Sequence, residues 1–281
     1  MEELDVVNGV VRRVYAGIGS RETPRPVLHL MAGVAVRLAL ADIALRSGGA
    51  DGADSAFEWG ADQVDTGLKQ IFLPWADFNK RRSPFDQPTE AMTDLAAAHH
   101  PAWGRLTSAA RKLHARNSAQ ILGPALDCPA RVVICWTPGG APVGGTGQAL
   151  RLAAAYGVPV INLGAERWRG ATSDDVAHAA LSIILARPGA PAALPRVLNK
   201  RQADAAADAA LIDRTTPLGN PYAIGRDGTR LAVVVTYKRW LAAQPGLKTR
   251  IEDLRGRDLL CWCAPKLCHG NVLLPLANRP V

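Results

Sequence analysis

The sequence of 281 residues lacks long apolar runs and has little charge. No stretch reaches the roughly 18 uninterrupted apolar residues of a membrane-spanning helix, so we expect no membrane partner. Charged residues make up 21% of the chain and apolar residues 48%, a balance that excludes an intrinsically disordered protein. Residues 1–5 lack the basic-then-apolar order of a signal peptide, which predicts a cytoplasmic protein.

Cysteine is scarce and unevenly placed. An odd count of five, without a signal peptide, argues against a disulfide framework. Cys128 and Cys135 lie near an apolar segment and are most simply packing residues. The other three, Cys261, Cys263 and Cys268, lie within eight residues of one another. They point to reactive thiols or to a metal site.

The net charge of +8 belongs almost wholly to one end of the chain. Residues 1–187 hold 19 Lys and Arg against 18 Asp and Glu, whereas residues 188–281 hold 14 against 7. A field that attracts polyanions is therefore expected only in the C-terminal part. Nucleic acid is a candidate partner of that part alone.

Residues 1–187 alternate between strand and helix patterns. Such alternation is typical of a parallel sheet covered by helices on both faces. We expect strands at 10–17, 69–74, 131–136 and 159–163 and helices at 26–46, 53–64 and 144–156. The fold class is thus predicted as α/β, with a Rossmann-like, doubly wound parallel sheet. An insert at 79–128, with a helix at 107–122, is expected to cover the strand ends.

A Pro- and Ala-rich segment around residues 187–195 predicts a domain boundary. We expect a first domain at 1–187 and a second, smaller α/β domain at 195–281, with a helix at 229–244 and a strand at 258–263.

Three glycine-rich turns carry the chemistry expected of the first domain. Each precedes a predicted helix, so its backbone N–H groups and the positive helix end could receive a phosphate. The carboxyl ends of parallel strands meet at one edge of a sheet, which favours a nucleotide site over three unrelated tight turns. The candidate ligand-binding residues are Gly17, Gly19, Ser20, Arg21, Gly48, Gly49, Asp51, Gly52, Gly144, Gly145 and Thr146.

These turns, at residues 15–24, 48–54 and 144–149, together resemble the SLOG superfamily over about residues 10–185. That group covers the bacterial DNA-processing recombination mediator, cytokinin-activating phosphoribohydrolases and many phage or conflict-system proteins. The resemblance implies a Rossmann-like fold that binds a nucleotide, a nucleotide-derived ligand or single-stranded DNA. In the insert, Arg116 and Asn117 resemble a segment of the phage-type members, which implies a phosphate contact and a base or ribose contact.

One position departs from the phosphoribohydrolase pattern. Arg151 stands about where that branch has a catalytic Glu. Losing the carboxylate weakens the case for cleavage of a glycosidic bond, although Asp51, Asp54 or Glu58 could take over that role. Binding without turnover is therefore favoured for this domain.

The cluster Cys261, Cys263, Cys268 and His269 is the sharpest local signal in the second domain. Three thiolates and an imidazole are enough ligands for zinc, although four ligands within nine residues is an unusual spacing. Alternatively, Cys263 or Cys268 is a nucleophile of low pKa, or the group is inert packing. Nearby, Arg214, Asn220 and Arg226 lie in a Pro- and Gly-rich loop that suits an anionic ligand.

Motifs at residues 215–228 and 261–273 also resemble a family of small domains of uncharacterised function, common in phages and actinobacteria. The sequence thus favours a homo-oligomeric, phage- or mobile-element-associated protein that binds a nucleotide or nucleotide derivative. Its basic domain is expected to bind or act on a related anionic substrate. The alternatives are a single-stranded-DNA-binding recombination mediator without catalysis, and a nucleotide N-glycosidase or phosphoribohydrolase.

Overall fold

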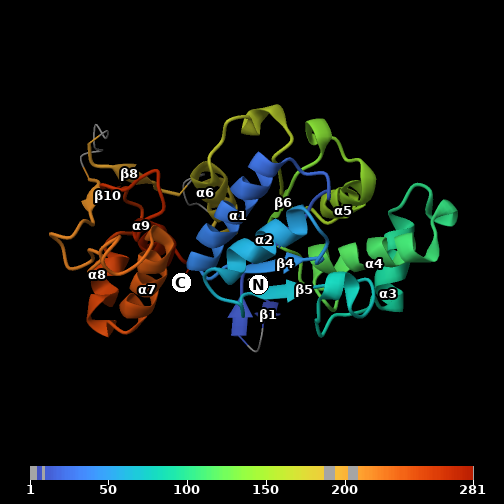
Figure 1. The fold of residues 1–281 in the computed structure, drawn as a ribbon, viewed down its shortest axis with the longest axis horizontal. Helices are drawn as coiled ribbons and strands as arrows, with labels where there is room; N and C mark the ends of the chain where they lie inside the picture. The colour runs from blue at the N-terminus through green and yellow to red at the C-terminus, as the bar shows by residue number, and fades with distance from the viewer. Residues whose placement is uncertain (1–4, 8–9, 187–193, 202–207, 281) are drawn as a thin grey trace. The chain divides into compact units, whose positions relative to one another are not determined.

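A computed structural model describes residues 5–7, 10–186, 194–201 and 208–280 (Figure 1). The chain divides into two compact units, residues 1–176 and 177–281, and helix α6 (Ser173–Ile184) spans the division. Most of the linker predicted at 187–195 lies outside the described residues. Within the described ranges, no helix has the length and apolar character needed to cross a membrane.

The first unit is built on a five-stranded parallel sheet, which confirms the predicted fold class. Its strands run in the order β5-β4-β3-β6-β7, and a separate antiparallel pair joins β1 to β2. The bounds are β1 (Asp5–Val7), β2 (Val10–Arg12), β3 (Val14–Gly17), β4 (Ala44–Ser47), β5 (Lys69–Ile71), β6 (Val133–Cys135) and β7 (Val160–Asn162). The chain order reverses between β3 and β6, and ligands of such sheets bind at that reversal.

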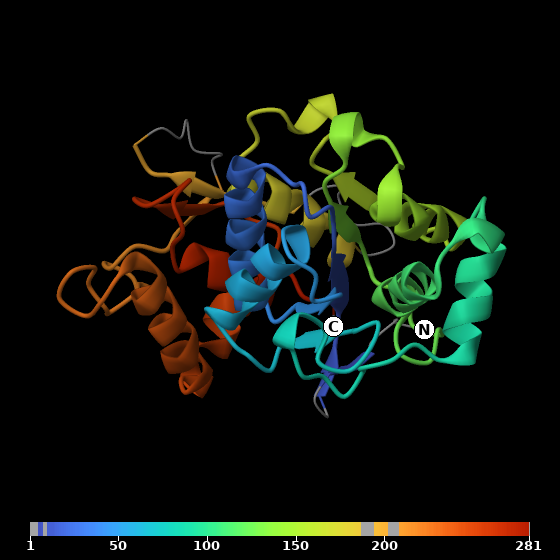
Figure 2. The same cartoon turned by 45° about the vertical axis from the view of Figure 1, so that its right-hand side comes forward.

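Helices cover both faces of this sheet. Figure 2 shows α1 and α2, in blue, on one side of the strands, and α4 and α5, in green, on the other. The bounds are α1 (Arg25–Leu40), α2 (Ala53–Asp62), α3 (Glu90–Ala98), α4 (Ser108–Leu122) and α5 (Gly144–Ala155). Short 3₁₀ turns lie at Phe78–Lys80, Trp103–Arg105, Pro138–Gly140, Glu166–Trp168 and Pro245–Leu247.

The prediction of a helix at 26–46 is wrong at the C-terminal end of that range. The helix stops at Leu40, Asp42 turns the chain with a φ of 61°, and β4 begins at Ala44. Strand β4 lies between β3 and β5 and is buried on both faces, so it lacks the alternation that marks a half-exposed strand. Arg46 stays inside this strand because its guanidinium donates to Gln70 Oε1 at 2.9 Å and to the Cys128 carbonyl at 2.6 Å.

The second unit has a small parallel sheet of its own, in the order β8-β10-β9. Its strands are β8 (Val197–Asn199), β9 (Ala210–Leu211) and β10 (Leu259–Cys261), and its helices are α7 (Arg230–Ala242), α8 (Lys248–Glu252) and α9 (Gly270–Ala277). Tyr237 of α7 is fully buried and donates its hydroxyl to the Leu218 carbonyl at 2.7 Å. A second, smaller α/β fold was expected and is confirmed.

Candidate functional site

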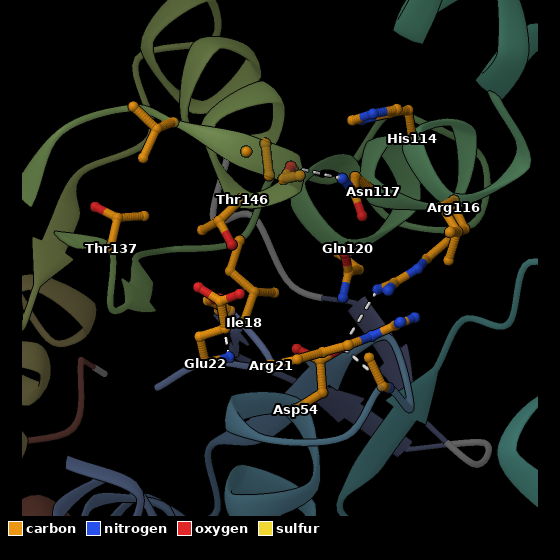
Figure 3. A pocket seen from close by; sticks show the side chains of 18 of the residues that line it. Ile18, Arg21, Glu22, Asp54, His114, Arg116, Asn117, Gln120, Thr137 and Thr146 are labelled. Atoms are coloured by element: carbon orange, nitrogen blue, oxygen red, sulfur yellow. Dashed lines mark hydrogen bonds and ion pairs between the residues drawn. The ribbon is translucent and has the colours of Figure 1, made fainter. Parts of the chain in front are cut away.

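A cavity of about 470 Å³ lies at the carboxyl ends of β3 and β6 in the first unit (Figure 3). We call it the turn cavity, because the segments after β3, β4 and β6 all line it, together with α4. The lining residues with polar side chains are Ser20, Arg21, Glu22, Asp54, His114, Arg116, Asn117, Gln120, Thr137 and Thr146. The glycines Gly19, Gly144 and Gly145 line the cavity as well. The volume falls within the range of small-molecule sites, which is roughly 300–1,000 Å³.

The turn after β3 supplies an exposed cation to this cavity. Ser20 Oγ accepts the backbone N–H of Glu22 at 3.1 Å, and Thr23 Oγ1 donates to the Ser20 carbonyl at 2.7 Å. These bonds hold the turn, and the exposed side chain of Arg21 extends from it across the cavity toward Arg116 and Asp54 (Figure 3). Arg21 is thus placed to meet an anion.

A buried ion pair forms the floor of the turn cavity. Arg116 Nη1 lies 3.4 Å from Asp54 Oδ2, and the residues are 7% and 2% exposed. Burial raises the pKa of Asp54, although Arg116 and the backbone N–H groups of Ala50 and Gly19 oppose that rise. Burial lowers the pKa of Arg116, and Arg21 lowers it further, whereas Asp54 opposes both. The guanidinium groups of Arg21 and Arg116 therefore lie near each other in the turn cavity.

One face of α4 completes the lining. Asn117 Nδ2 donates to the Gly145 carbonyl and to Gln148 Oε1, both at 3.2 Å, so it joins α4 to the start of α5. Gln120 is 1% exposed, and its Nε2 has no hydrogen-bond partner among the residues that the structure describes. Burial and the nearby His100, Arg151 and Arg116 lower the pKa of His114 to about 4, so its ring is neutral at pH 7.

Helix α4 brings together the two residues that the resemblance singled out. Arg116 and Asn117 both line the turn cavity. Gln120 also lines it and was missed, although its place four residues after Arg116 puts it on the same helical face.

The structure separates the predicted turn residues into two groups. Lining the turn cavity are Gly19, Ser20, Arg21, Asp54, Gly144, Gly145 and Thr146, whereas Gly17, Gly48, Gly49, Asp51 and Gly52 do not line it. A Cβ at Gly48 would coincide with the Arg116 guanidinium, and one at Gly52 would lie 2.8 Å from the Ser20 carbonyl oxygen. These two glycines allow close packing around the cavity. At Gly144 and Gly145 a Cβ would meet only open space.

Arg151, at the position of the missing Glu, does not line the turn cavity. Its Nε donates to the His99 carbonyl at 3.1 Å. Asp51 is exposed and absent from the lining. Glu58 is absent from it too and pairs with Lys69 at 2.9 Å and Arg81 at 2.8 Å, so of the predicted carboxylates only Asp54 reaches the cavity.

A second cavity, of about 360 Å³, lies within the second unit, and we call it the thiol cavity. Its polar lining residues are Asp213, Arg214, Thr215, Asn220, Tyr222, Arg230, Cys261, Trp262, Cys263, Cys268 and His269. The predicted Arg226 does not line it, because its exposed guanidinium pairs with Asp227 at 2.7 Å. Arg214 donates to the carbonyls of Asn220 and Tyr222 and so closes the predicted loop.

Three of the four predicted metal ligands lie together here. One ligand atom each of Cys261, Cys268 and His269 lies within 4.8 Å of the others, and all three residues are buried. These three residues could hold a metal ion, and Cys263 stands outside the group.

The predicted low pKa of Cys263 is not found. The neighbouring Cys261 thiol raises the pKa of Cys263, and burial adds to that rise, while Arg230 opposes it. For Cys261, the hydrogen bond with Cys263 lowers the pKa, but Cys268 and burial raise it to about 11. Of the two thiols that the sequence suggested as nucleophiles, Cys263 is therefore not activated by its surroundings.

Comparison with known proteins places the second unit in a family. The family described as "Domain of unknown function (DUF4326)" matches residues 196–279. A curated relative from Enterobacteria phage T4, "Uncharacterized 12.4 kDa protein in nrdA-td intergenic region", is 36% identical over 91 residues, which make up 31% of this chain and 80% of the relative. The chain belongs to the DUF4326 family. One curated relative of the second unit is thus a phage protein, as the sequence motifs led us to expect.

Among solved structures, the chain is similar to the one titled "Structural insights into the unique single-stranded DNA binding mode of DNA processing protein A from Helicobacter pylori". The similarity covers 53% of this chain and 64% of that chain, at 20% identity and a TM-score of 0.35. At that TM-score, the likeness carries no argument about function.

Proposed function

We propose that the first unit binds a nucleotide or nucleotide-derived ligand in the turn cavity. The observation that supports this most strongly is the convergence of three turns and α4 on one cavity at the reversal of strand order. In doubly wound sheets this is the place where phosphate-bearing ligands bind. The expected SLOG-type binding role stays part of this proposal.

The lining offers separate partners for the separate parts of a nucleotide. Helix α5 begins at Gly144 without a side-chain cap, so its first N–H groups face the cavity and suit a phosphate, as does Arg21. Asp54 and Asn117 suit a ribose hydroxyl or a base amino group, because a carboxylate accepts and the Asn117 amide, whose Nδ2 already donates to Gly145 and Gln148, accepts through its oxygen. The unpartnered Nε2 of Gln120 is a further donor for the ligand.

Size and charge favour a small ligand over a DNA strand. A strand-binding groove needs several phosphate-neutralising cations and exposed aromatic platforms. The turn cavity has two guanidinium groups balanced by the carboxylates of Asp54 and Glu22, and no Trp, Tyr or Phe among its lining residues. We therefore place any longer polyanion with the basic second unit, where it would be a substrate or partner related to the nucleotide.

Isothermal titration of the full chain with AMP, ADP and ATP tests the proposal. Arg21→Ala should weaken binding about tenfold or more, because a hydrogen bond to a charged group contributes roughly 1.5–3 kcal/mol. Arg25→Ala is the matched control, since Arg25 is also exposed, lies four residues away and does not line the cavity.

Failure to bind any of the three nucleotides would overturn the proposal. Tight binding of oligo-dT with a steep salt dependence, in place of nucleotide binding, would favour the recombination-mediator alternative. Release of free base from the nucleotides would instead assign hydrolysis, and native mass spectrometry of the same samples would report the oligomeric state.

A further inference from the structure

The three buried ligands in the second unit come from two segments that the fold brings together. Cys261 ends strand β10, while Cys268 and His269 immediately precede helix α9. Their ligand atoms lie within 4.8 Å of one another. Tetrahedral zinc holds such atoms about 3.3–3.8 Å apart, so closing around an ion requires shifts of only about 1 Å.

The orientation of His269 favours metal binding. Its Nε2 lies 2.6 Å from the Ile212 carbonyl oxygen, and the residue is 6% exposed. A carbonyl oxygen only accepts, so Nε2 carries the proton and the lone pair of the neutral ring is on Nδ1. Histidines that ligate metals are typically fixed in this way, with the other ring N–H donated to a carbonyl or carboxylate.

Hydrogen bonds hold Cys268 in place beside the other two ligands. The Gly270 N–H at the start of α9 donates to Cys268 Sγ at 3.3 Å, and Asn271 Oδ1 accepts the Cys268 N–H at 2.9 Å. Two independent sets of contacts thus orient two neighbouring residues toward Cys261.

We propose that Cys261, Cys268 and His269 Nδ1 bind one zinc ion whose fourth position opens into the thiol cavity and takes an oxygen of a phosphate-class anion. Two soft thiolates and one imidazole suit zinc in tetrahedral coordination. Three protein ligands and an open position are typical of zinc sites that meet a substrate, whereas structural sites use four. Cys263 also lines the cavity and its thiol interacts with that of Cys261, but it is not one of the three residues whose ligand atoms all lie within 4.8 Å of one another.

The cavity wall supplies partners for the anion. The cationic residues Arg214 and Arg230 line the same cavity as the three ligands, whereas the buried amide of Asn220 is bonded to the Val233 carbonyl and the Tyr222 N–H. Arg230 is held by a bond from Nη1 to the Leu267 carbonyl at 3.2 Å, next to Cys268 in the chain. Trp262 also lines the cavity and is 49% exposed, and the charged ends of Lys200 and Arg201 lie over its ring at 5.0 and 5.2 Å from the centroid. This inference concerns the second unit and is independent of the nucleotide proposal for the first.

Metal content of the full chain, produced with added zinc, tests the site. The wild type should hold one zinc per chain, Cys261→Ser and Cys268→Ser should lose it, and Cys263→Ser should keep it, as should Cys128→Ser, a control in the first unit. A zinc-free wild type would overturn the proposal. Loss of zinc from Cys263→Ser would also overturn it, because the site would then have four protein ligands. These two results decide the matter even if Cys268→Ser fails to fold.

Cobalt(II) exchange tests the open position. The sulfur-to-cobalt charge-transfer absorption of the wild type should be unchanged in Cys263→Ser, because both proteins present two thiolates to the metal. Added inorganic phosphate should then shift the visible cobalt bands of both proteins, and Arg230→Ala should require about tenfold more phosphate for the same shift. Cobalt bands that do not respond to phosphate would overturn the open, anion-binding position.

Discussion

The two cavities are polar in different ways. The turn cavity is built largely from backbone turns, and its one buried ion pair, Asp54 with Arg116, comes from α2 and α4. The thiol cavity is built from side chains, with two buried cysteines and a buried histidine beside arginines. The first offers N–H groups and guanidinium groups at fixed places, and the second offers soft ligands that lie close together.

This difference separates two ways of building a ligand site. A turn at the end of a parallel strand is placed by the sheet itself, so the site needs few special side chains. A thiol and imidazole group instead depends on where a strand stops and a helix starts, and it needs contacts such as His269 with Ile212 to orient each ligand. Substitutions should therefore act differently in the two cavities.

The largest effect is expected for Asp54→Ala in the turn cavity. Removing the carboxylate leaves the 7% exposed Arg116 without its ion-pair partner, and an uncompensated buried charge costs about 3–5 kcal/mol. Urea unfolding followed by far-UV circular dichroism measures this loss. The control Asp51→Ala, at an exposed position, should change stability by no more than about 0.5 kcal/mol. Equal losses in both variants would contradict a structural role for the ion pair.

Two glycine substitutions test which turns pack against neighbouring side chains and which turns face the ligand. Gly48→Ala would force the Arg116 guanidinium to move, and overpacking of this kind costs about 1–3 kcal/mol. Gly145→Ala meets open space at the start of α5 and should leave stability unchanged or slightly higher, yet weaken nucleotide binding at that helix end. Thermal unfolding and titration with ADP measure the two effects. A destabilised Gly145→Ala chain that still binds ADP normally would reverse this assignment.

The turn cavity could be predicted from sequence in outline but not in detail. Strands ending in glycine turns predict a shared edge, and Gly19, Arg21 and Thr146 do lie at one cavity. Gly17 looks the same in sequence, yet a Cβ there would clash with Leu45 and Phe57. Whether a glycine faces a ligand or a neighbouring side chain depends on distant packing partners, which no local pattern contains.

Strand β4 and the thiol group show the same limit. Leu45 and Arg46 were assigned to a helix because a strand buried on both faces has no alternating pattern. Cys261 and Cys263 look equivalent in sequence, but β10 ends at Cys261, so only the first is in the group with Cys268. The cysteines and the histidine indicated metal or thiol chemistry, but the position at which β10 ends determines which of them lie together.

A smaller effect is expected from the pH dependence of the turn cavity. His114 has a pKa of about 4 in the folded chain, against an ordinary value of 6.5, because burial disfavours its charged form. The unfolded chain then binds more protons between these values, so stability is full above pH 6.5 and falls as the pH drops toward 4. Since His114 is only half-buried, we expect a loss on the order of 1 kcal/mol. Denaturation of His114→Gln at pH 7.5 and 5 should show a smaller loss than the wild type, and an unchanged loss would contradict this assignment.

The smallest effect is expected at a residue that looked important in the sequence. Within the described part of the chain, the guanidinium of Arg226 forms hydrogen bonds and an ion pair only with its exposed neighbour Asp227, and such surface pairs contribute little. Arg226→Ala should therefore leave the melting temperature unchanged. Arg214→Ala is the matched comparison, because Arg214 binds the carbonyls of Asn220 and Tyr222 and holds the loop that lines the thiol cavity. Its loss should lower the melting temperature by about 2–4 °C, as expected for about 1 kcal/mol in a chain of this size. Equal shifts for the two arginines would mean that the loop is not held by these bonds, and the wall of the thiol cavity would need another support.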